Sequence, residues 1–138
     1  MNIGLVSCTK LKRRTRCAAR ELYSASPLFR KAAAYCERHY DCWYILSAKH
    51  GLLHPDTVIA PYDVTLKAMP AAERRAWGRR VSAALRALGP PTFYAHAGHA
   101  YISDLEDVDL VNPLEGYGQG QRLQWYNEQA AKEGWQCP

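Results

Sequence analysis

The sequence predicts an α/β fold, a three-layer sandwich with a central, mainly parallel, four-stranded sheet. Four short apolar runs are rich in β-branched and aromatic residues, as is typical of buried strands. The segments between them carry apolar residues at helical spacing. Strands that alternate with helices in this way favour a parallel sheet covered by helices on both faces.

The first half of the chain supplies two of these strands and one helix. Residues 2–6 form an apolar run, and the basic segment 10–20 after it lacks an apolar period, which predicts a loop or an irregular helix. Ser26 and Pro27 then offer an N-cap and a first helical residue. That helix leads into the strand at residues 43–46.

The second half predicts three helices and two strands. Residues 70–88 form the clearest helix, with Trp77, Val81 and Leu88 on its buried side. A strand at 92–95, a short helix at 99–105, a strand at 108–111 and a helix at 121–132 follow.

Composition indicates one domain. The chain has 138 residues, and single domains commonly have ~100–150 residues. Its 48% hydrophobic content excludes wholesale disorder. No apolar run is long enough for a membrane span and no signal peptide is evident. Five cysteines without paired spacing favour a reducing, cytoplasmic setting, and no metal or cofactor is predicted.

Polar side chains follow all four predicted strands. Because ligands of open α/β sheets bind outside the carboxyl ends of the strands, we expect these side chains to line one cleft. The predicted substrate- and phosphate-binding residues are Ser7, Cys8, Lys10, Arg20, Ser47, Lys49, Tyr62, His96, Gly98, Tyr101 and Asn112.

Each group in this set has an expected role. Lys10 and Lys49 bind phosphate, and Arg20 assists them. Tyr62 stacks on a nucleobase, as Tyr101 could. The Asn112 amide offers both a donor and an acceptor to a base edge.

Candidate catalytic residues stand in the same segments. Asp63 or Glu115 would activate water or stabilise an oxocarbenium-like centre, and His50 is the third candidate. Cys8 is interpreted first as a small residue that fills a tight turn. The alternative is a nucleophile activated by the nearby Lys10.

The net charge of +5 favours anionic partners. Arg13, Arg14, Arg74 and Arg75 are candidate nucleic-acid contacts, on a loop and on the helix at 70–88. Ordinary solvated surface is the alternative interpretation of the same residues.

Several motifs resemble the bacterial and phage DUF6884 family. They are Ser7-Cys8-Thr9-Lys10, Ala19 to Tyr23 with Ser26 and Phe29, Leu46-Ser47-Ala48-Lys49-His50-Gly51-Leu52, Pro61-Tyr62-Asp63 with Leu66, and Gly118 to Leu123. The middle motif is specific, and the resemblance covers essentially the whole chain.

Two further resemblances are fainter. The YaaA peroxide-stress family has Ser-Pro-Ala-Lys, Leu-Ser-Gly-x-Tyr-Gly and Pro-Tyr-Arg elements where residues 7–10, 46–51 and 61–63 stand, and it implies DNA binding under oxidative stress. The segment Asn112-Pro113-Leu114-Glu115 is similar to the last motif of the uracil-DNA glycosylase fold, which implies a base-binding pocket.

The function expected from these observations concerns nucleotides or nucleic acid. The first hypothesis is an enzyme that binds nucleobase and phosphate and hydrolyses or transfers at an N-glycosidic bond. The alternative is a non-catalytic, YaaA-like DNA-binding protein of the peroxide response. A partner domain in a modification or defence operon is the third possibility.

Overall fold

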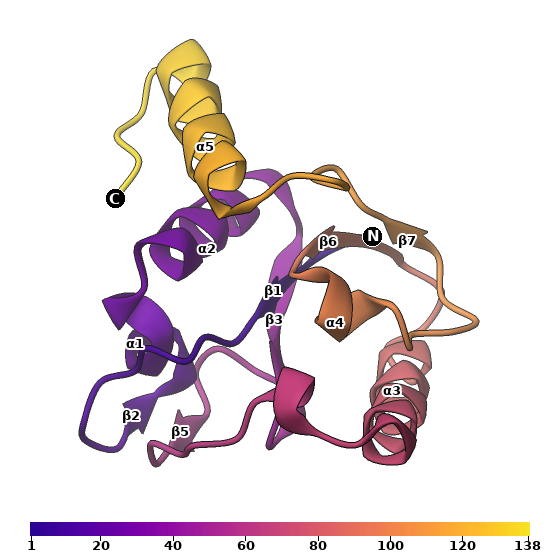
Figure 1. Cartoon of the computed structure of the whole chain (residues 1–138). Helices are drawn as coiled ribbons and strands as arrows, with labels where there is room; N and C mark the ends of the chain where they lie inside the picture. Colours follow the sequence, from indigo (N-terminus) through magenta and orange to yellow (C-terminus); the bar gives the residue numbers. More distant parts are fainter.

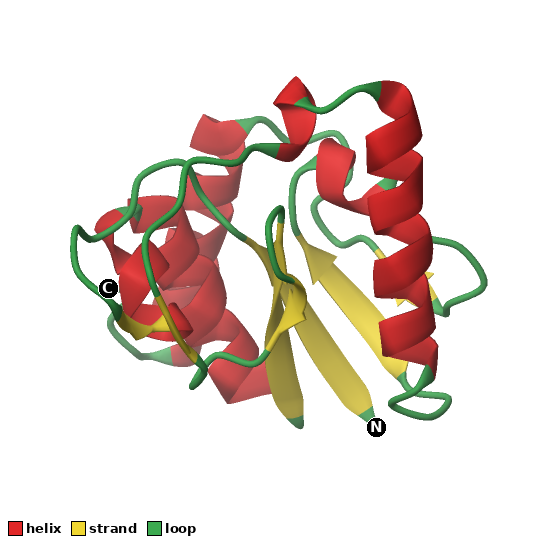
Figure 2. Ribbon diagram, turned by 90° about the horizontal axis from the view of Figure 1, so that it is seen from below, coloured by secondary structure: helices red, strands yellow, loops and turns green.

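The computed structural model describes residues 1–138 and has a central sheet between two layers of helices (Figure 1; Figure 2). The strands of this sheet are β1 (Asn2–Ser7), β3 (Cys42–Ser47), β4 (Gly51–Leu53), β6 (Thr92–His96) and β7 (Leu110–Val111). Their order is β4-β3-β1-β6-β7, and all neighbours are parallel except β3 and β4. The predicted α/β sandwich is therefore confirmed.

The predicted number of strands was wrong, because the sheet has five strands and not four. The added strand is β4, which turns back on β3 and pairs Gly51 with Ser47. Gly51 has φ of +69°, a conformation that glycine adopts without strain. Three residues are too few to form an alternating pattern, so β4 has no strand signal in the sequence. A separate small sheet pairs β2 (Cys17–Ala18) with β5 (Val58–Ile59).

Two long helices cover one face of the sheet and one covers the other (Figure 2). On the first face, α2 (Pro27–His39) packs against β1, β3 and α5 (Gln119–Glu133). On the second lies α3 (Ala71–Arg86), and the short α4 (His99–Ile102) contacts the 3-10 turn η2 (Leu66–Ala68). The remaining short helices are α1 (Ala19–Leu22) and η1 (Tyr23–Ala25). None of these helices is both long and apolar enough to cross a membrane.

The helix α2 begins where its sequence predicts. The Ser26 side chain accepts a hydrogen bond from the backbone N–H of Phe29 at 3.3 Å, and Pro27 is the first helical residue. The helix packs very close to β1. A Cβ added at Gly4 would stand only 2.7 Å from the Cys36 sulfur. Only glycine at position 4 permits this approach.

The helix α3 buries Trp77, Val81 and Leu85, which confirms most of its predicted apolar stripe. Leu88 is an exception, with 38% of its surface exposed. The helix ends at Arg86, ahead of the predicted end, so Leu88 lies in the turn that follows and leaves the helical face.

The chain order locates the most favourable site for a ligand. From β1 the chain passes through α2 to β3 on one side, and it returns through α3 to β6 on the other side. The carboxyl ends of β1 and β6 thus form a topological switch point, where open α/β sheets bind their ligands.

Candidate functional site

Cys8 lies directly after β1, at the carboxyl edge of the sheet. Its backbone N–H donates to the Leu46 carbonyl at 2.9 Å, which extends the pairing with β3 by one residue. Only 7% of Cys8 is exposed. The backbone N–H of Ala48 donates to the Cys8 Sγ at 3.4 Å, and the Tyr101 hydroxyl lies 3.2 Å from the same sulfur. The side chain that follows the central strand is therefore enclosed by polar groups.

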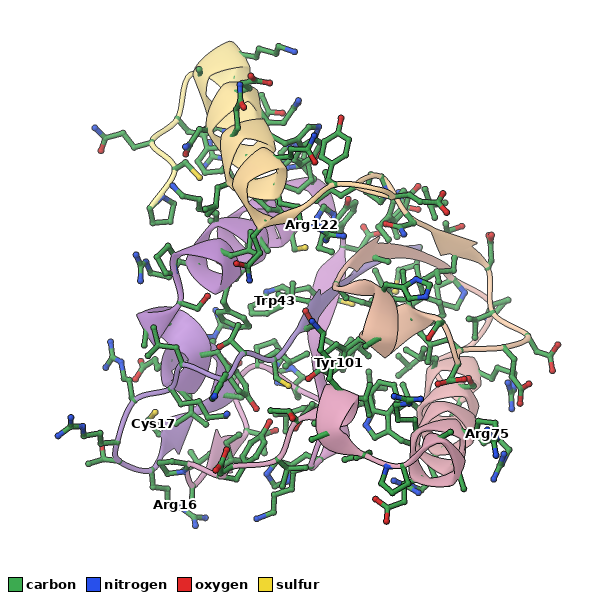
Figure 3. All side chains as sticks on the ribbon, viewed as in Figure 1. Arg16, Cys17, Trp43, Arg75, Tyr101 and Arg122 are labelled. Atoms are coloured by element: carbon green, nitrogen blue, oxygen red, sulfur yellow. The ribbon has the colours of Figure 1, made fainter.

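Tyr101 reaches this sulfur from α4. Its ring packs edge-on against Trp77, with 5.8 Å between the ring centroids. Burial raises the pKa of the Tyr101 hydroxyl, and the nearby Cys8 raises it further, while a hydrogen bond with the Leu66 backbone opposes them. Figure 3 shows Tyr101 near the centre of the molecule, between the sheet edge and α3. The phenol thus stays protonated and remains available as a donor.

Three hydroxyl groups form a chain beside Cys8. The Tyr62 hydroxyl lies 2.8 Å from the Ser47 Oγ and 2.6 Å from the Tyr23 hydroxyl. Ser47 is fully buried, and its Oγ accepts from the backbone N–H of His50 at 3.0 Å. Burial raises the pKa of Tyr23 to about 12 and also raises the pKa of Tyr62. These phenols are therefore neutral hydrogen-bonding groups at physiological pH.

Two lysine ammonium groups lie near the ring of Tyr62. The Nζ of Lys12 is 4.5 Å from the ring centroid, and the Nζ of Lys49 is 5.8 Å from it. Neither lysine forms an ion pair with a carboxylate. Burial lowers the pKa of Lys12, and the nearby Cys8 and Asp63 raise it.

His50 completes this basic surrounding. Its ring meets the Tyr62 ring edge-on, with 5.5 Å between centroids. Burial lowers the pKa of His50, and the Lys49 charge lowers it further. We give the name rim cluster to the six residues Cys8, Lys12, Ser47, Lys49, Tyr62 and Tyr101, and His50 and Tyr23 lie against it.

Other predicted residues lie on the loops around the rim cluster. Ser7 ends β1, while Lys10 and Gly98 are exposed in the loops after β1 and β6. Asp63 is exposed and follows Tyr62 directly, and it is close enough to Lys12 to influence its pKa. The structure therefore groups the middle motif, the Pro-Tyr-Asp motif and the end of β1.

The matched family extends over the same elements. The model of a family of unknown function, DUF6884, matches residues 3–128. The chain belongs to the DUF6884 family. A relative in Bacillus subtilis, the uncharacterized protein YfjM, is 46% identical over 41 residues. That match spans 29% of this chain and 27% of YfjM, so the chain corresponds to about a quarter of that relative's length. No solved structure matches the chain significantly.

In this DUF6884 domain the side chain of His96 points away from the rim cluster. It is 3% exposed, and each ring nitrogen lies 2.7 Å from a hydroxyl, Nδ1 from Tyr126 and Nε2 from Tyr40. Burial, together with the charges of Arg122 and His39, lowers the pKa of His96 to about 3. His96 is thus held inside the core. We name this the His96 cluster, formed by Tyr35, Tyr40, His96, Trp125 and Tyr126.

Arg20 is likewise committed to other partners. Its guanidinium forms ion pairs with Glu37 and Asp56 and lies over the ring of Trp43, 5.6 Å from the centroid. These contacts join α1, α2 and the turn between β4 and β5. The predicted role of Arg20 in phosphate binding would require breaking both pairs.

Asn112 and Glu115 follow β7, two strands away from β1. Adjacent strands lie about 4.8 Å apart, so β7 lies roughly 10 Å to the side of β1, and its last residue, Val111, is level with Gly4 and not with Ser7. The Oδ1 atom of Asn112 is buried and has no hydrogen-bond partner, and Glu115 is exposed. An unpaired buried acceptor is uncommon and makes Asn112 the more distinctive of the two.

Sequence reasoning missed Arg122, which fixes the loops of this domain at the carboxyl edge. It donates to the carbonyl oxygens of Ala97 at 3.3 Å, Leu114 at 3.4 Å and Tyr117 at 3.1 Å. Figure 3 shows it between the start of α5 and the neighbouring loops. Its sequence signals were its place in the motif Gly118 to Leu123 and in the glycine-flanked start of the last helix. Lys12 and Tyr23 were also missed as site residues.

The predicted nucleic-acid-binding arginines do not form one patch. Figure 3 shows Arg16, on the loop that also carries Arg13 and Arg14, and Arg75, on α3, at opposite flanks of the molecule. Arg13 also donates to the Ser24 hydroxyl at 3.2 Å. The two groups of arginines therefore lie on separate parts of the molecule.

A separate surface depression lies elsewhere. It has a volume of about 640 Å³ and lies at the amino edge of the sheet, between the end of α3 and the start of β6. Its lining includes Arg86, Phe93, Asp107 and Asp109, and it shares no residue with the rim cluster. Its lining lacks the lysine, cysteine and tyrosine side chains of the rim cluster, so we regard the carboxyl edge as the better candidate site.

Proposed function

We propose that this DUF6884 domain binds a nucleotide, free or within nucleic acid, at the rim cluster and acts on its N-glycosidic bond. The observation that carries the proposal is the pair of ammonium groups of Lys12 and Lys49 over the Tyr62 ring, without carboxylate partners. Two cations without carboxylate partners at a topological switch point suit a phosphate, although Lys12 also donates to the Lys10 carbonyl at 3.3 Å.

Each residue of the site has one role in this proposal. Lys12 and Lys49 hold the phosphate, and the exposed Lys10 adds a third positive charge. The Asn112 amide contacts the edge of the base, which gives its buried oxygen a partner. Asp63 takes a proton from water as the water attacks the anomeric carbon. His50 or Glu115 supplies the proton that the departing base requires.

Ligand binding can be tested by thermal shift with nucleoside 5′-monophosphates, using nucleosides and inorganic phosphate as comparisons. At 100 times Kd a ligand adds about 2.7 kcal/mol, which corresponds to a rise in Tm on the order of 8 °C. Lys12→Met and Lys49→Met should each reduce the shift. Lys132→Met, on the exposed end of α5, is the matched control and should leave it unchanged.

Turnover can be tested by chromatographic detection of free base. Asp63→Asn should abolish base release and keep the thermal shift, because it removes a proton acceptor and leaves the lysines in place. Glu73→Gln, in the first turn of α3, is the control carboxylate. An unchanged rate in Asp63→Asn would remove Asp63 from the mechanism, and no release by wild-type protein from any nucleotide would remove the reaction.

A second candidate function is DNA binding without turnover, as in a YaaA-like protein of the peroxide response in the cytoplasm. The specific observation in its favour is that Arg14, Arg16, Arg74 and Arg75 form no ion pair. Its affinity would fall steeply with salt, and charge reversal at Arg13 and Arg14 would weaken binding about equally for every sequence. A flat salt response contradicts this candidate.

A further inference from the structure

Cys8 differs from the other four cysteines in what surrounds its sulfur. Burial raises the pKa of Cys36 well above its ordinary value and also raises the pKa of Cys42. Cys17 lies half-buried in the small sheet, and Cys137 faces the Lys31 ammonium at 3.8 Å. Only the Cys8 sulfur lies within hydrogen-bonding distance of both a main-chain N–H and a phenol.

Both of these groups can donate to the sulfur. The backbone N–H of Ala48 points to Sγ at 3.4 Å. The Tyr101 hydroxyl lies 3.2 Å from the Cys8 Sγ, and a phenol can donate its proton to a sulfur at this distance. Two donors stabilise negative charge on sulfur, the form in which a cysteine is nucleophilic.

The lysines of the rim cluster add positive charge near Cys8 and would hold a phosphate beside it. The Lys12 ammonium is close enough to Cys8 for the sulfur to raise the pKa of the lysine, and it is one of the two cations over the Tyr62 ring. Cys8 stands at the end of β1, beside the switch point with β6. A phosphate on the two lysines would therefore bring the rest of a nucleotide next to the sulfur.

We propose that Cys8 is a covalent nucleophile that accepts the pentose of the bound nucleotide, so that the domain transfers the pentose between bases. This inference rests on the proposed function and adds the identity of the nucleophile. It also favours transfer over simple hydrolysis, since an enzyme-bound pentose can be returned to a second base.

The step balances without a redox partner. The Cys8 thiolate attacks the anomeric carbon, the C–S bond forms and the C–N bond breaks. The electron pair of the C–N bond stays on the base, which takes a proton from His50 or Glu115. In the second step a nitrogen of another base, or water activated by Asp63, attacks the same carbon. The C–S bond then breaks and the thiolate is restored.

The first experiment measures the nucleophilicity of Cys8 without any ligand. The native protein is treated with iodoacetamide, and each cysteine is followed by peptide mass spectrometry. Cys8 should react about tenfold faster than Cys17 at pH 7, despite its lower exposure. Tyr101→Phe should slow Cys8 and leave Cys17 unchanged. Equal rates at the two cysteines would overturn the inference.

The second experiment measures pentose transfer. Wild-type protein is incubated with a nucleoside 5′-monophosphate and an isotopically labelled free base. Label should enter the nucleotide, and intact mass should reveal a pentosyl-phosphate adduct on the Cys8 peptide. Cys8→Ser should lose both signals, and Cys17→Ser, the matched control, should keep them. If Cys8→Ser does not fold, the same loss of exchange is expected for Cys8→Ala or, in part, Tyr101→Phe.

The outcomes separate the two proposals. Base release that persists in Cys8→Ser, with no adduct in the wild type, overturns the nucleophile and leaves the proposed function standing. Absence of both nucleotide binding and base release in the wild type overturns the proposed function, and the pentose transfer fails with it. In that case fast alkylation of Cys8 would still establish the reactive sulfur.

Discussion

The rim cluster and the His96 cluster both combine tyrosines with other titratable side chains, two lysines and a cysteine in the first and a histidine in the second. Both stand near the carboxyl ends of adjacent central strands, β1 and β6. In the His96 cluster the two ring nitrogens are both occupied, by Tyr40 and Tyr126 at 2.7 Å. In the rim cluster the hydroxyls are also paired, but Lys12 and Lys49 have no carboxylate.

This difference distinguishes a structural cluster from a candidate site. A buried imidazole with both nitrogens bonded has no capacity left for a ligand, and its neighbours require it to stay in place. Two ammonium groups without counterions hold positive charge that an anion can neutralise. The two clusters therefore differ less in residue type than in whether their titratable groups already have partners within the protein.

The largest expected effect on stability comes from His96→Phe. The substitution keeps a ring in the core but leaves the hydroxyls of Tyr40 and Tyr126 without their shared partner. Each unpaired buried hydroxyl costs about 1–3 kcal/mol, so the free energy of unfolding should fall by about 3 kcal/mol. Urea denaturation followed by circular dichroism measures it. Alkylation of Cys8 should stay unchanged, and its loss would contradict the separation of the two clusters.

The pH dependence of stability tests the same cluster. The pKa of His96 is about 3 in the folded protein and near 6.5 when unfolded. Between these values the unfolded state binds more protons, so stability is complete above pH 6.5 and is lost as the pH falls toward 3. The slope from this group is at most about 1.4 kcal/mol per pH unit. Urea titrations from pH 7 to 4 should show a shallower slope in His96→Phe, and equal slopes would contradict the assignment.

Two matched tyrosine substitutions sharpen the comparison. Tyr126→Phe removes a buried hydroxyl from His96 and should cost about 2 kcal/mol. Tyr62→Phe should cost about 1 kcal/mol or less, because Ser47 keeps its bond with the His50 N–H. Thermal denaturation gives the stability order, and nucleotide titration should show weaker binding for Tyr62→Phe alone. Weaker binding in Tyr126→Phe would mean that the core cluster supports the ligand.

The smallest expected effect on stability comes from Lys12→Met. The substitution removes an unpaired surface charge, so the free energy of unfolding should change by less than about 0.5 kcal/mol. Affinity for a nucleoside monophosphate should nevertheless fall about tenfold, which isothermal titration measures. A large loss of stability with intact binding would reverse the roles assigned to the two clusters.

The sequence located the strand ends well but not the side-chain directions. Ser47, Lys49 and Tyr62 follow apolar runs whose ends are easy to place, and the structure brings them together. His96 also ends a strand, yet it shares a face with Tyr94, which stacks on Tyr40 under α2. Residues two apart on a strand point the same way, so this alternation was the available signal.

Other features depended on tertiary contacts that no local pattern encodes. Arg20 lies in a basic segment, but the carboxylates that bind it are 17 and 36 residues further along the chain. Arg122 acts through three backbone carbonyls, which every residue type possesses. The orphan oxygen of Asn112 likewise becomes visible only when its surroundings are known.

Trp77 links the buried face of α3 to the rim cluster. Its indole N–H donates to the Ser47 carbonyl at 2.9 Å, and its ring packs edge-on against Tyr101. Indole emission responds to hydrogen bonding and to neighbouring charge, so the protein contains its own fluorescent reporter at the candidate site. With the other three tryptophans replaced by phenylalanine, ligand occupancy and alkylation of Cys8 become optical signals that need no added dye.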